Sequence, residues 1–297
     1  MLESAPSDMT ALMALGRAQM LSSAFEDACA TYQRVVELDA PNHEAWRALA
    51  ESLRFRDRLD EALDAIKHAM ALAPDNPRVM AHDVFIRMRA CAWDGLDNTR
   101  VALRDITYKT LSRGQPSPMR PFMAATCYGD PALALEVGAA ESRRLNFKSL
   151  APAIVKQKRD DRLTVGYLSA GFCNHPTGQL VRRLFTHHDH KRLRVAMLDI
   201  GVDDGSDLLR ELRGSCAMVL DLQRLSDHSA ALAIRDAGVD ILVDLHSWLQ
   251  NHRMAIAAHR PCPVQVSWLG FPGTSGSSAK TSCAWAAVTS PTIPTPS

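Results

Sequence analysis

The sequence predicts an α + α/β fold, in which helical hairpins are followed by one domain built on a parallel sheet. Two features of the chain carry this prediction. Residues 1–150 are rich in Ala, Leu, Arg and Met and poor in Gly, and their first half repeats with a period of 34 residues. Residues 160–273 instead contain β-branched apolar runs that alternate with helical patterns. The charged stretch 151–162 between them lacks a clear period and is expected to be a connector.

The N-terminal repeats emerge when residues 11–42 are aligned with residues 45–76. The matched positions are Leu12 with Trp46, Leu15 with Leu49, Gly16 with Ala50, Ala28 with Ala62, Tyr32 with Ile66, Val35 with Ala69 and Leu38 with Leu72. This is the tetratricopeptide arrangement, in which small residues let two helices approach and large ones fill the gaps. Pro41 and Pro74 stop the helices near the end of each unit. We therefore assign residues 1–78 to tetratricopeptide-type repeats.

A third repeat is expected to begin at Pro77, and its pattern decays at residues 91–95. Because two or three repeats are only marginally stable alone, the array should pack against the segment that follows it. Residues 79–150 keep a helical pattern, broken at residues 112–121 and 128–131 by Pro and Gly. We assign them to a helical connecting region.

The second half of the chain predicts five strands and four intervening helices. The strands are expected at residues 163–168, 193–199, 218–222, 239–245 and 264–268, and the helices at about 176–188, 205–214, 226–237 and 251–259. Strand–helix–strand units at this spacing are right-handed and give a parallel sheet covered on both faces. Residues 160–276 therefore predict a doubly wound, Rossmann-like domain.

Composition excludes several classes of protein. The 297 residues are 46% hydrophobic, enough for two domains, and Lys+Arg 34 against Asp+Glu 33 argues against a nucleic-acid or anionic-membrane surface. No apolar run reaches the ~20 residues of a membrane helix, and no secretory signal pattern begins the chain. Seven scattered cysteines without a C-x-x-C spacing indicate reduced thiols. A cytoplasmic protein is expected, with residues 277–297, rich in Ser, Thr, Ala and Pro, as an irregular, disordered tail.

Candidate chemistry gathers where the predicted strands end, because ligands of such sheets bind beyond the carboxyl ends of the strands. Asn174-His175, residues 203–206 and His246-Ser247 all fall at such ends. His175 could serve as a general base or orient a substrate hydroxyl or phosphate. The alternative is a hydrogen-bonded loop histidine, with Pro176 simply starting the next helix.

Three further groups of residues allow either a functional or a structural interpretation. The histidines at residues 187–190 could suggest a metal site, but a solvated turn is favoured between a helix and a strand. The glycines of loop 269–276 match neither nucleotide-binding spacing, so the loop either presents free amides to a phosphate or is a structural turn. Arg253 and Arg260 could each hold a carboxylate or phosphate, or be surface arginines.

Four motifs then stand in a fixed order: RLTVGYLSAGFCNHPT at 162–177, DDGS at 203–206, DILVDL at 240–245 and RPCPVQVSWLGFPGTSG at 260–276. Together with the helical repeats, this set resembles the O-linked N-acetylglucosamine transferase family, in particular its bacterial and SPINDLY-like members. The resemblance covers roughly residues 10–276. It implies the N-terminal half of a GT-B type inverting glycosyltransferase, whose C-terminal half binds the UDP-sugar and whose repeats guide protein acceptors.

The resemblance also implies roles for individual residues. His175 would lie in the active-site cleft as a candidate base, flanked by Asn174 and Thr177 of the same motif. A second set would lie near the sugar and phosphates: Pro272, Gly273, Thr274 and Gly276. A Ser or Thr hydroxyl would attack the anomeric carbon of UDP-GlcNAc as UDP leaves. The family stabilises UDP with amides and basic groups, so neither a metal nor a further cofactor is expected.

The chain departs from the family pattern at several places. Gly171 stands where the family often has an acid, Gln179 replaces a usual second histidine, and Ser247-Trp248-Leu249 replaces a usual G-[YH]-T. The acid that precedes the strand at 240–245 is shifted by one residue, to Asp236. Asp236, Arg253 and Arg260 are therefore expected only as supporting residues.

After Gly276 the family continues into a strand and a second Rossmann-like domain, which predicts a frameshift or truncation at this point. Since a GT-B site is built between two domains, the chain alone is expected to be inactive. The primary interpretation is an O-GlcNAc transferase-like protein that modifies Ser/Thr hydroxyls, with the sugar, GlcNAc or fucose, left open. The alternative is a non-catalytic tetratricopeptide module that binds proteins. A single-sheet enzyme is disfavoured, because the chain has no G-x-G-x-x-G and no nucleophile elbow.

Overall fold

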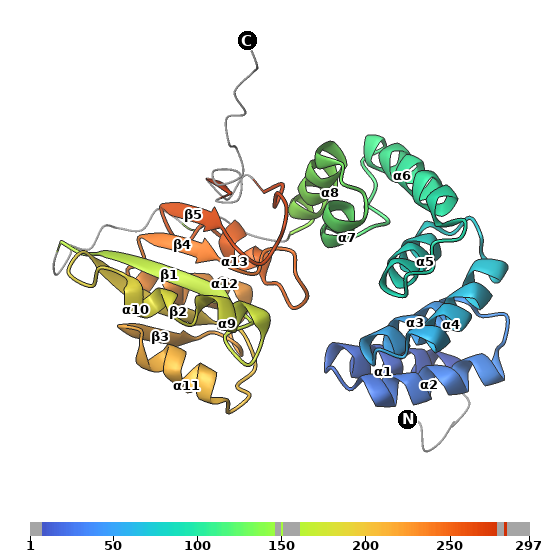
Figure 1. The fold of residues 1–297 in the computed structure, drawn as a ribbon, viewed down its shortest axis with the longest axis horizontal. Coiled ribbons are helices and arrows are strands. Elements are labelled where there is room, and N and C mark those ends of the chain that lie inside the picture. Colours follow the sequence, from blue (N-terminus) through green and yellow to red (C-terminus); the bar gives the residue numbers. More distant parts are fainter. Residues whose placement is uncertain (1–7, 146–149, 151–160, 278–281, 284–297) are drawn as a thin grey trace, which may run out of the picture. The chain divides into compact units, whose positions relative to one another are not determined.

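The computed structural model describes residues 8–145, 150, 161–277 and 282–283, shown in Figure 1. These residues form two compact units, divided between Met119 and Arg120. The division falls inside the segment 79–150 that was expected to be one connecting region. Its first two helices belong to the first unit, and its last two belong to the second.

The first unit consists of antiparallel helical hairpins. Its helices are α1 (Met9–Leu21), α2 (Phe25–Leu38), α3 (His43–Phe55), α4 (Leu59–Leu72), α5 (Pro77–Arg89) and α6 (Leu96–Ser112). Helices α1, α3 and α5 begin 34 residues apart, and so do α2 and α4. The tetratricopeptide-type repeat is thereby confirmed, and the third unit does begin at Pro77.

The turns of the first unit repeat as strictly as its helices. The residue before each odd-numbered helix accepts hydrogen bonds from the first turn through its side chain: Asp8, Asn42 and Asn76. The turn inside each hairpin contains a residue with positive φ: Ser23 (62°), Asp57 (58°) and Cys91 (54°). Both sets are spaced by 34 residues, so the third repeat keeps its turn where the side-chain pattern decays.

Small and large side chains interlock inside these hairpins. A Cβ atom at Gly16 would lie 2.6 Å from the ring of Tyr32, so only glycine leaves room for that ring. Ala28, Ala45 and Ala62 are fully buried between the helices. This close approach is the one that the spacing of small residues predicted.

The second unit begins with two helices, α7 (Pro121–Cys127) and α8 (Pro131–Arg143), and continues into a six-stranded sheet. The strands are β1 (Leu163–Ser169), β2 (Leu193–Asp199), β3 (Met218–Asp221), β4 (Ile241–Asp244), β5 (Val264–Ser267) and β6 (Ser282–Cys283). Their spatial order is β3-β2-β1-β4-β5-β6, and every pair is parallel. The predicted Rossmann-like sheet is confirmed.

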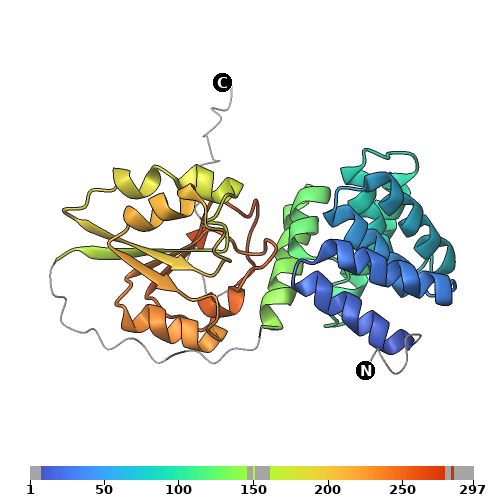
Figure 2. The ribbon, with the colours of Figure 1, turned by 90° about the horizontal axis from the view of Figure 1, so that it is seen from below.

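Helices cover both faces of this sheet, as Figure 2 shows. On one face, Val165, Tyr167 and Met197 pack with α9 (Pro176–Val181), α10 (Leu184–His187) and α11 (Asp207–Gly214). On the other face, Leu168 and Leu198 pack with α12 (Asp227–Asp236) and α13 (Met254–Ala258). Successive residues of β1 and β2 therefore point to opposite helical layers, which is why their sequences are apolar throughout.

Two expectations for this unit need correction. The single helix expected at 176–188 is divided into α9 and α10, with Arg182 N–H bonded to the Gln179 carbonyl three residues back. Within the tail expected to be irregular, Ser282–Cys283 form β6, because the outer edge of β5 offers unpaired backbone groups for a parallel partner. The other expected tail residues after Ser277 lie outside the described ones.

Candidate active site at the carboxyl edge of the sheet

The strand order predicts a crevice at one edge of the sheet. From β1 the chain passes to α9 on one face, and from the neighbouring β4 it passes to α13 on the other face. Connections that leave adjacent parallel strands in opposite directions open a space beyond their carboxyl ends, where ligands of doubly wound sheets bind. Ser169 ends β1 and Asp244 ends β4, so the segments that follow them line this crevice.

His175 lies on the β1 side of the crevice as the N-terminal cap of α9. Its Nδ1 accepts a hydrogen bond from the backbone N–H of Thr177 at 3.2 Å. The ring lies against the turn at Gly171, where a Cβ atom would be 2.7 Å from Nδ1. Thr177 is buried, whereas Asn174 and His175 are exposed. Gly171 thus leaves the space that the imidazole occupies, and a larger residue there would displace the ring.

His246 approaches from the β4 side, with its ring centroid 6.4 Å from that of His175. It is buried, and its backbone N–H donates to Asp244 Oδ1 at 2.8 Å. Its Nδ1 lies 3.3 Å from Ser169 Oγ, and its Nε2 lies 2.8 Å from the Gln250 carbonyl oxygen. The sequence had placed His246 at a strand end without giving it a role. The signal available in the sequence was the position of His246, which follows β4, the strand that pairs with β1.

The partners of the two histidines determine where each neutral ring carries its proton. A carbonyl oxygen only accepts, so His246 donates from Nε2 to Gln250, and its Nδ1 accepts the Ser169 hydroxyl. Ser169 Oγ in turn accepts the backbone N–H of Gly171 at 2.9 Å. His175 Nδ1 accepts from an amide, so its proton is also on Nε2.

Both imidazoles are held in the neutral form. Desolvation by burial lowers the pKa of His246, although its bond to Gln250 and the nearby Asp244 carboxylate act in the opposite direction. Desolvation also lowers the pKa of His175, because the ring is partly enclosed although the residue as a whole is exposed. At neutral pH, neither ring brings a positive charge to the crevice.

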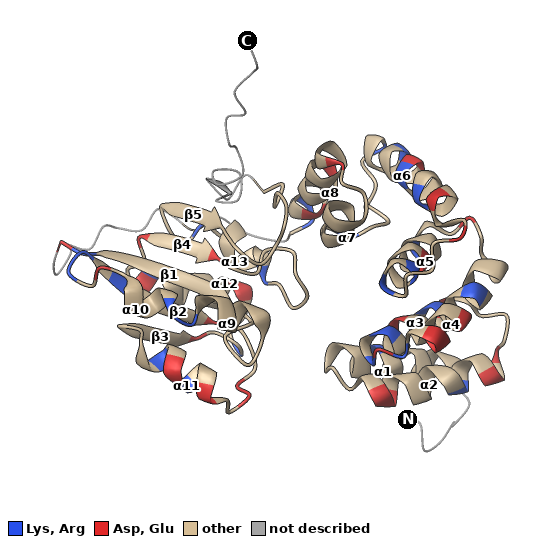
Figure 3. Cartoon of the chain, viewed as in Figure 1, with Lys and Arg blue, Asp and Glu red and all other residues tan. Residues whose placement is uncertain are grey.

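The DDGS loop after β2 also holds the segment around His175, through a hydrogen bond to Asn174. Asp204 Oδ2 accepts the backbone N–H of Asn174 at 2.8 Å. Asp203 pairs with Arg213 of α11 at 2.6 Å, which holds the pKa of Asp203 below its usual range. Arg213 also reaches the buried Asp199 at the end of β2, 3.4 Å away. Figure 3 shows basic and acidic residues mixed along α11.

The loop after β5 is a folded turn, one of the two alternatives left open for it. The Ser275 carbonyl accepts from Trp248 Nε1 at 2.7 Å and from the Ser142 hydroxyl of α8 at 3.1 Å. Gly276 has a positive φ of 63°, and a Cβ atom there would lie 2.1 Å from the Ala139 backbone nitrogen. Thr274 Oγ1 accepts the Gly276 N–H at 3.2 Å.

Pro272 at the tip of this loop is exposed and Gly273 is half-buried. The loop is joined to the β4 side of the crevice through Trp248, which follows His246 by two residues. In the sequence Trp248 stood out only as part of the Ser247-Trp248-Leu249 departure from the family pattern, and its hydrogen bond to the loop was not expected.

Among the contacts of the described residues, none of the three supporting candidates bonds to His175. Arg253 donates to the Leu222 and Leu225 carbonyls at 2.7 and 2.6 Å and to Asp227 at 2.7 Å, so its guanidinium holds the connection between β3 and α12. Asp236 ends α12, and Arg260 follows α13 before β5. Both therefore lie towards the edge where the strands begin.

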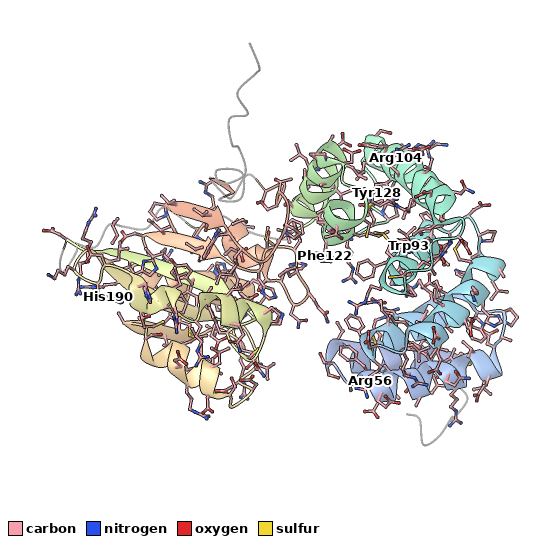
Figure 4. The ribbon with its side chains drawn as sticks, viewed as in Figure 1. Arg56, Trp93, Arg104, Phe122, Tyr128 and His190 are labelled. Atoms are coloured by element: carbon pink, nitrogen blue, oxygen red, sulfur yellow. The ribbon has the colours of Figure 1, made fainter. Side chains whose placement is uncertain are left out.

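The histidines at 187–190 form separate contacts. His187 Nδ1 bonds to the Arg183 carbonyl at 2.7 Å, and His188 Nε2 bonds to the Tyr167 hydroxyl at 2.8 Å. His190 is exposed in the turn before β2 (Figure 4). Across the described residues, no group of three His, Cys, Asp or Glu side chains is arranged to hold a metal ion. None of the helices described is long and apolar enough to cross a bilayer.

A tetratricopeptide-type array joined to a Rossmann-like sheet with its crevice between β1 and β4 defines a repeat-bearing protein of the glycosyltransferase class. The profile described as Glycosyl transferase family 41 matches residues 145–294, half of the chain, and the chain belongs to this family. The match runs beyond Gly276, where the motifs had suggested that the resemblance stops.

Proteins of similar sequence agree with this assignment. The chain is 26% identical over 197 residues to the probable UDP-N-acetylglucosamine–peptide N-acetylglucosaminyltransferase SEC of Arabidopsis thaliana, covering 63% of this chain and 20% of that protein. It is 36% identical over 131 residues to the UDP-N-acetylglucosamine–peptide N-acetylglucosaminyltransferase of Caenorhabditis elegans, covering 44% and 11%. The chain thus spans a fifth or less of the length of these relatives.

A solved structure, the K341M mutant of the Thermobaculum terrenum O-GlcNAc transferase, shares the fold. Its TM-score is 0.68 at 21% identity, over 93% of this chain and 53% of that one. The overlap includes both the helical repeats and the parallel sheet, and it supports the order of the two units along the chain.

Proposed function

We propose that this chain supplies the acceptor side of an O-GlcNAc transferase-like glycosyltransferase of the GT-B type. The observation that supports this most strongly is the crevice between β1 and β4, lined by His175 within the N-H-P-T motif of family 41. The reaction is transfer of GlcNAc from UDP-GlcNAc to a Ser or Thr hydroxyl, with UDP leaving. The activities named for the plant and nematode relatives support the same donor and a peptide acceptor.

In this proposal, the donor sits between the crevice and a second domain. Asn174 and His175 face the reacting sugar from the β1 side, the buried Thr177 holds the His175 ring through its amide, and loop 269–276 borders the sugar from the β5 side. No metal or further cofactor takes part. A cleft between two domains must hold donor and acceptor together in near-attack geometry, which a single sheet domain does not do alone. The described residues contain one such sheet.

The test compares two arms, each with UDP-GlcNAc and a Ser/Thr-containing protein acceptor, and detects the sugar on the acceptor by mass spectrometry. The first arm contains the chain alone. The second contains the chain fused to a donor-binding domain from a full-length relative. We expect transfer in the second arm only, and its loss with His175→Ala. Transfer by the chain alone would remove the need for a second domain.

A second candidate function is a non-catalytic protein-binding module. The strict 34-residue spacing of caps and turns in the first unit favours it, because stacked helical repeats form extended binding surfaces. Absence of transfer in both arms would favour this function. Partners captured by the chain should then persist with His175→Ala and be lost when the repeat surface is altered.

A further inference from the structure

The way His175 is held restricts what its side chain can do in the crevice. Its Nδ1 faces the Thr177 amide and the Gly171 turn, so this nitrogen is engaged as an acceptor. The Gly171 turn is itself fixed by Ser169. The Ser169 Oγ accepts the Gly171 N–H and donates to His246. Within the described part of the chain, no protein group bonds to His175 Nε2. The free end of the ring is therefore an N–H group.

An N–H group cannot accept a proton, so a base at this position would need the other tautomer. Moving the proton to Nδ1 would set two N–H donors, those of His175 and Thr177, against each other at 3.2 Å. Adding a second proton to make an imidazolium would produce the same opposition and would also charge a partly desolvated ring. The geometry therefore disfavours both forms that a general base would have to pass through.

The charges near the ring also restrict the ligand. Asp204 lies next to Asn174. Its exposed carboxylate accepts the backbone N–H of Asn174. The neighbouring Asp203 is compensated by Arg213, whereas Asp204 has no cationic partner among its contacts within the described residues. The other groups close to the ring, Cys173 and His246, are neutral at neutral pH, since burial raises the pKa of the thiol and lowers that of the imidazole. A phosphoryl anion would meet repulsion here, and an uncharged oxygen would not.

We propose that His175 is fixed as the Nε2–H tautomer and donates a hydrogen bond from Nε2 to an uncharged ligand oxygen, with Ser169 and His246 as the pair that positions it. The ligand part of this inference rests on the proposed function, which supplies two sources of such an oxygen. One is a hydroxyl or carbonyl group of the sugar, and the other is the Ser/Thr hydroxyl of the acceptor. The proton of the attacking hydroxyl is then taken by another group.

The first test reads the tautomer directly and needs no turnover. Long-range ¹H–¹⁵N spectra of the full chain are recorded at neutral pH and through a pH titration, and the His175 signals are identified by their loss in His175→Asn. We expect the Nε2–H tautomer and a pKa below the ordinary value. An Nδ1–H tautomer, or an imidazolium at neutral pH, would overturn the proposal. Ser169→Ala should mix the tautomers, and an unchanged ring in that variant would refute the positioning role of the pair.

The second test identifies the oxygen. N-acetylglucosamine, a Ser-containing peptide and pyrophosphate are added separately, and the His175 and Gly171 signals are followed. We expect one or both uncharged probes to shift the signals, and this outcome names the source. A shift with pyrophosphate alone would overturn the preference for an uncharged ligand, and no shift with any probe would overturn the ligand role. In neither case would the transferase function itself be contradicted, because transfer is measured separately.

Two matched substitutions of His175 separate its role as a hydrogen-bond donor from its role as the N-cap of α9. His175→Gln places an amide N–H near the position of Nε2, whereas His175→Asn keeps an acceptor for the Thr177 amide but has nothing at Nε2. For the probe that binds, we expect His175→Gln to retain most of the affinity and His175→Asn to lose about tenfold or more. Equal affinities in the two variants would contradict the donor role.

Discussion

Ser169 joins the two histidines of the crevice through its hydroxyl group. It is fully buried, accepts the Gly171 N–H at 2.9 Å and lies 3.3 Å from His246 Nδ1. Its replacement by Ala leaves both partners buried without a bond. We expect Ser169→Ala to lower the free energy of unfolding of the second unit by about 1–3 kcal/mol, measured by urea denaturation.

The matched control for that substitution is Ser229→Ala. Ser229 is exposed in the first turn of α12, and its hydroxyl accepts from Ser226 Oγ at 2.9 Å. Its loss should change stability by less than about 0.5 kcal/mol. Equal effects of the two substitutions would show that the hydroxyl of Ser169 has no special structural role.

The buried His246 makes stability depend on pH. Burial lowers its pKa in the folded state, so the unfolded chain binds a proton first as the pH falls through the ordinary value of 6.5. Stability is therefore complete above about pH 7 and is lost progressively as the pH falls towards the folded-state pKa. His175, His188 and His252 shift in the same direction and add to the slope.

Replacing His246 measures its contribution to the pH dependence of the unfolding free energy. In His246→Asn the amide oxygen can still accept the Ser169 hydroxyl, but the residue no longer titrates. We expect unfolding free energies measured between about pH 7 and pH 5 to fall less steeply in the variant, by up to one proton equivalent. The same slope in both proteins would mean that His246 is not held neutral by the fold.

At the scale of single elements, loop 269–276 depends on its contact with α8. Gly276 combines a positive φ with a backbone approach that leaves no room for a Cβ atom. Gly276→Ala should therefore destabilise the second unit by more than the ~1 kcal/mol expected from conformational strain alone. Thermal or urea unfolding measures the loss.

Gly238→Ala supplies the comparison for this loop. Gly238 has a similar φ of 73°, but no atom lies within 4 Å of the position that a Cβ would occupy. The difference between the two variants measures the packing of the loop against α8. If Gly238→Ala is as destabilising as Gly276→Ala, the close approach contributes nothing.

The third helical repeat is tested through its cap. Asn76 accepts from the Arg78 and Val79 backbone amides and also bonds to His43 Nε2 at 3.2 Å. Asn76→Ala should lower the stability of the first unit by about 0.5–2 kcal/mol, and Asn76→Asp should recover part of it. Unfolding followed by far-UV circular dichroism gives both values, and an unaffected Ala variant would argue against a cap at this position.

The elements were predictable where the sequence has a strong local period. The five longer strands were placed within two residues at each end, because buried parallel strands are continuous apolar runs such as ILVD of β4. The division at Arg182 and the strand β6 were not predictable. The first depends on a local change in hydrogen bonding, and the second on an edge of β5 that exists only once the sheet has formed.

The candidate site was predictable only in part, for a similar reason. His175 stood out because it follows a strand and precedes a proline. Its relation to Ser169 and His246 joins residues 77 positions apart, through a strand pairing that no local pattern specifies. Arg253 illustrates the reverse case, since a residue that could bind an anion donates one hydrogen bond from each of its three nitrogens to carbonyls and a carboxylate of its own unit.

At the scale of the whole molecule, the chain joins a tetratricopeptide-type helical array to a Rossmann-like unit of glycosyltransferase family 41. The repeats of the first unit have regular caps and turns, and the second unit ends its β1 and β4 strands at a crevice that contains two neutral histidines. The proposed division of labour is that the first unit selects an acceptor protein and the second receives its hydroxyl group. The same proposal requires a donor-binding domain to complete the cleft.

The most direct measurement is the rate of GlcNAc transfer by the chain fused to a donor-binding domain, compared among wild type, His175→Gln and His175→Asn. Loss of one hydrogen bond donated to the reacting ligand should slow His175→Asn by about 10–100-fold, while His175→Gln stays within about tenfold of wild type. A general base would instead cost about 10²–10⁴-fold in both variants. Equal, large losses would contradict the donor role of His175, and unchanged rates in both would remove His175 from the site altogether.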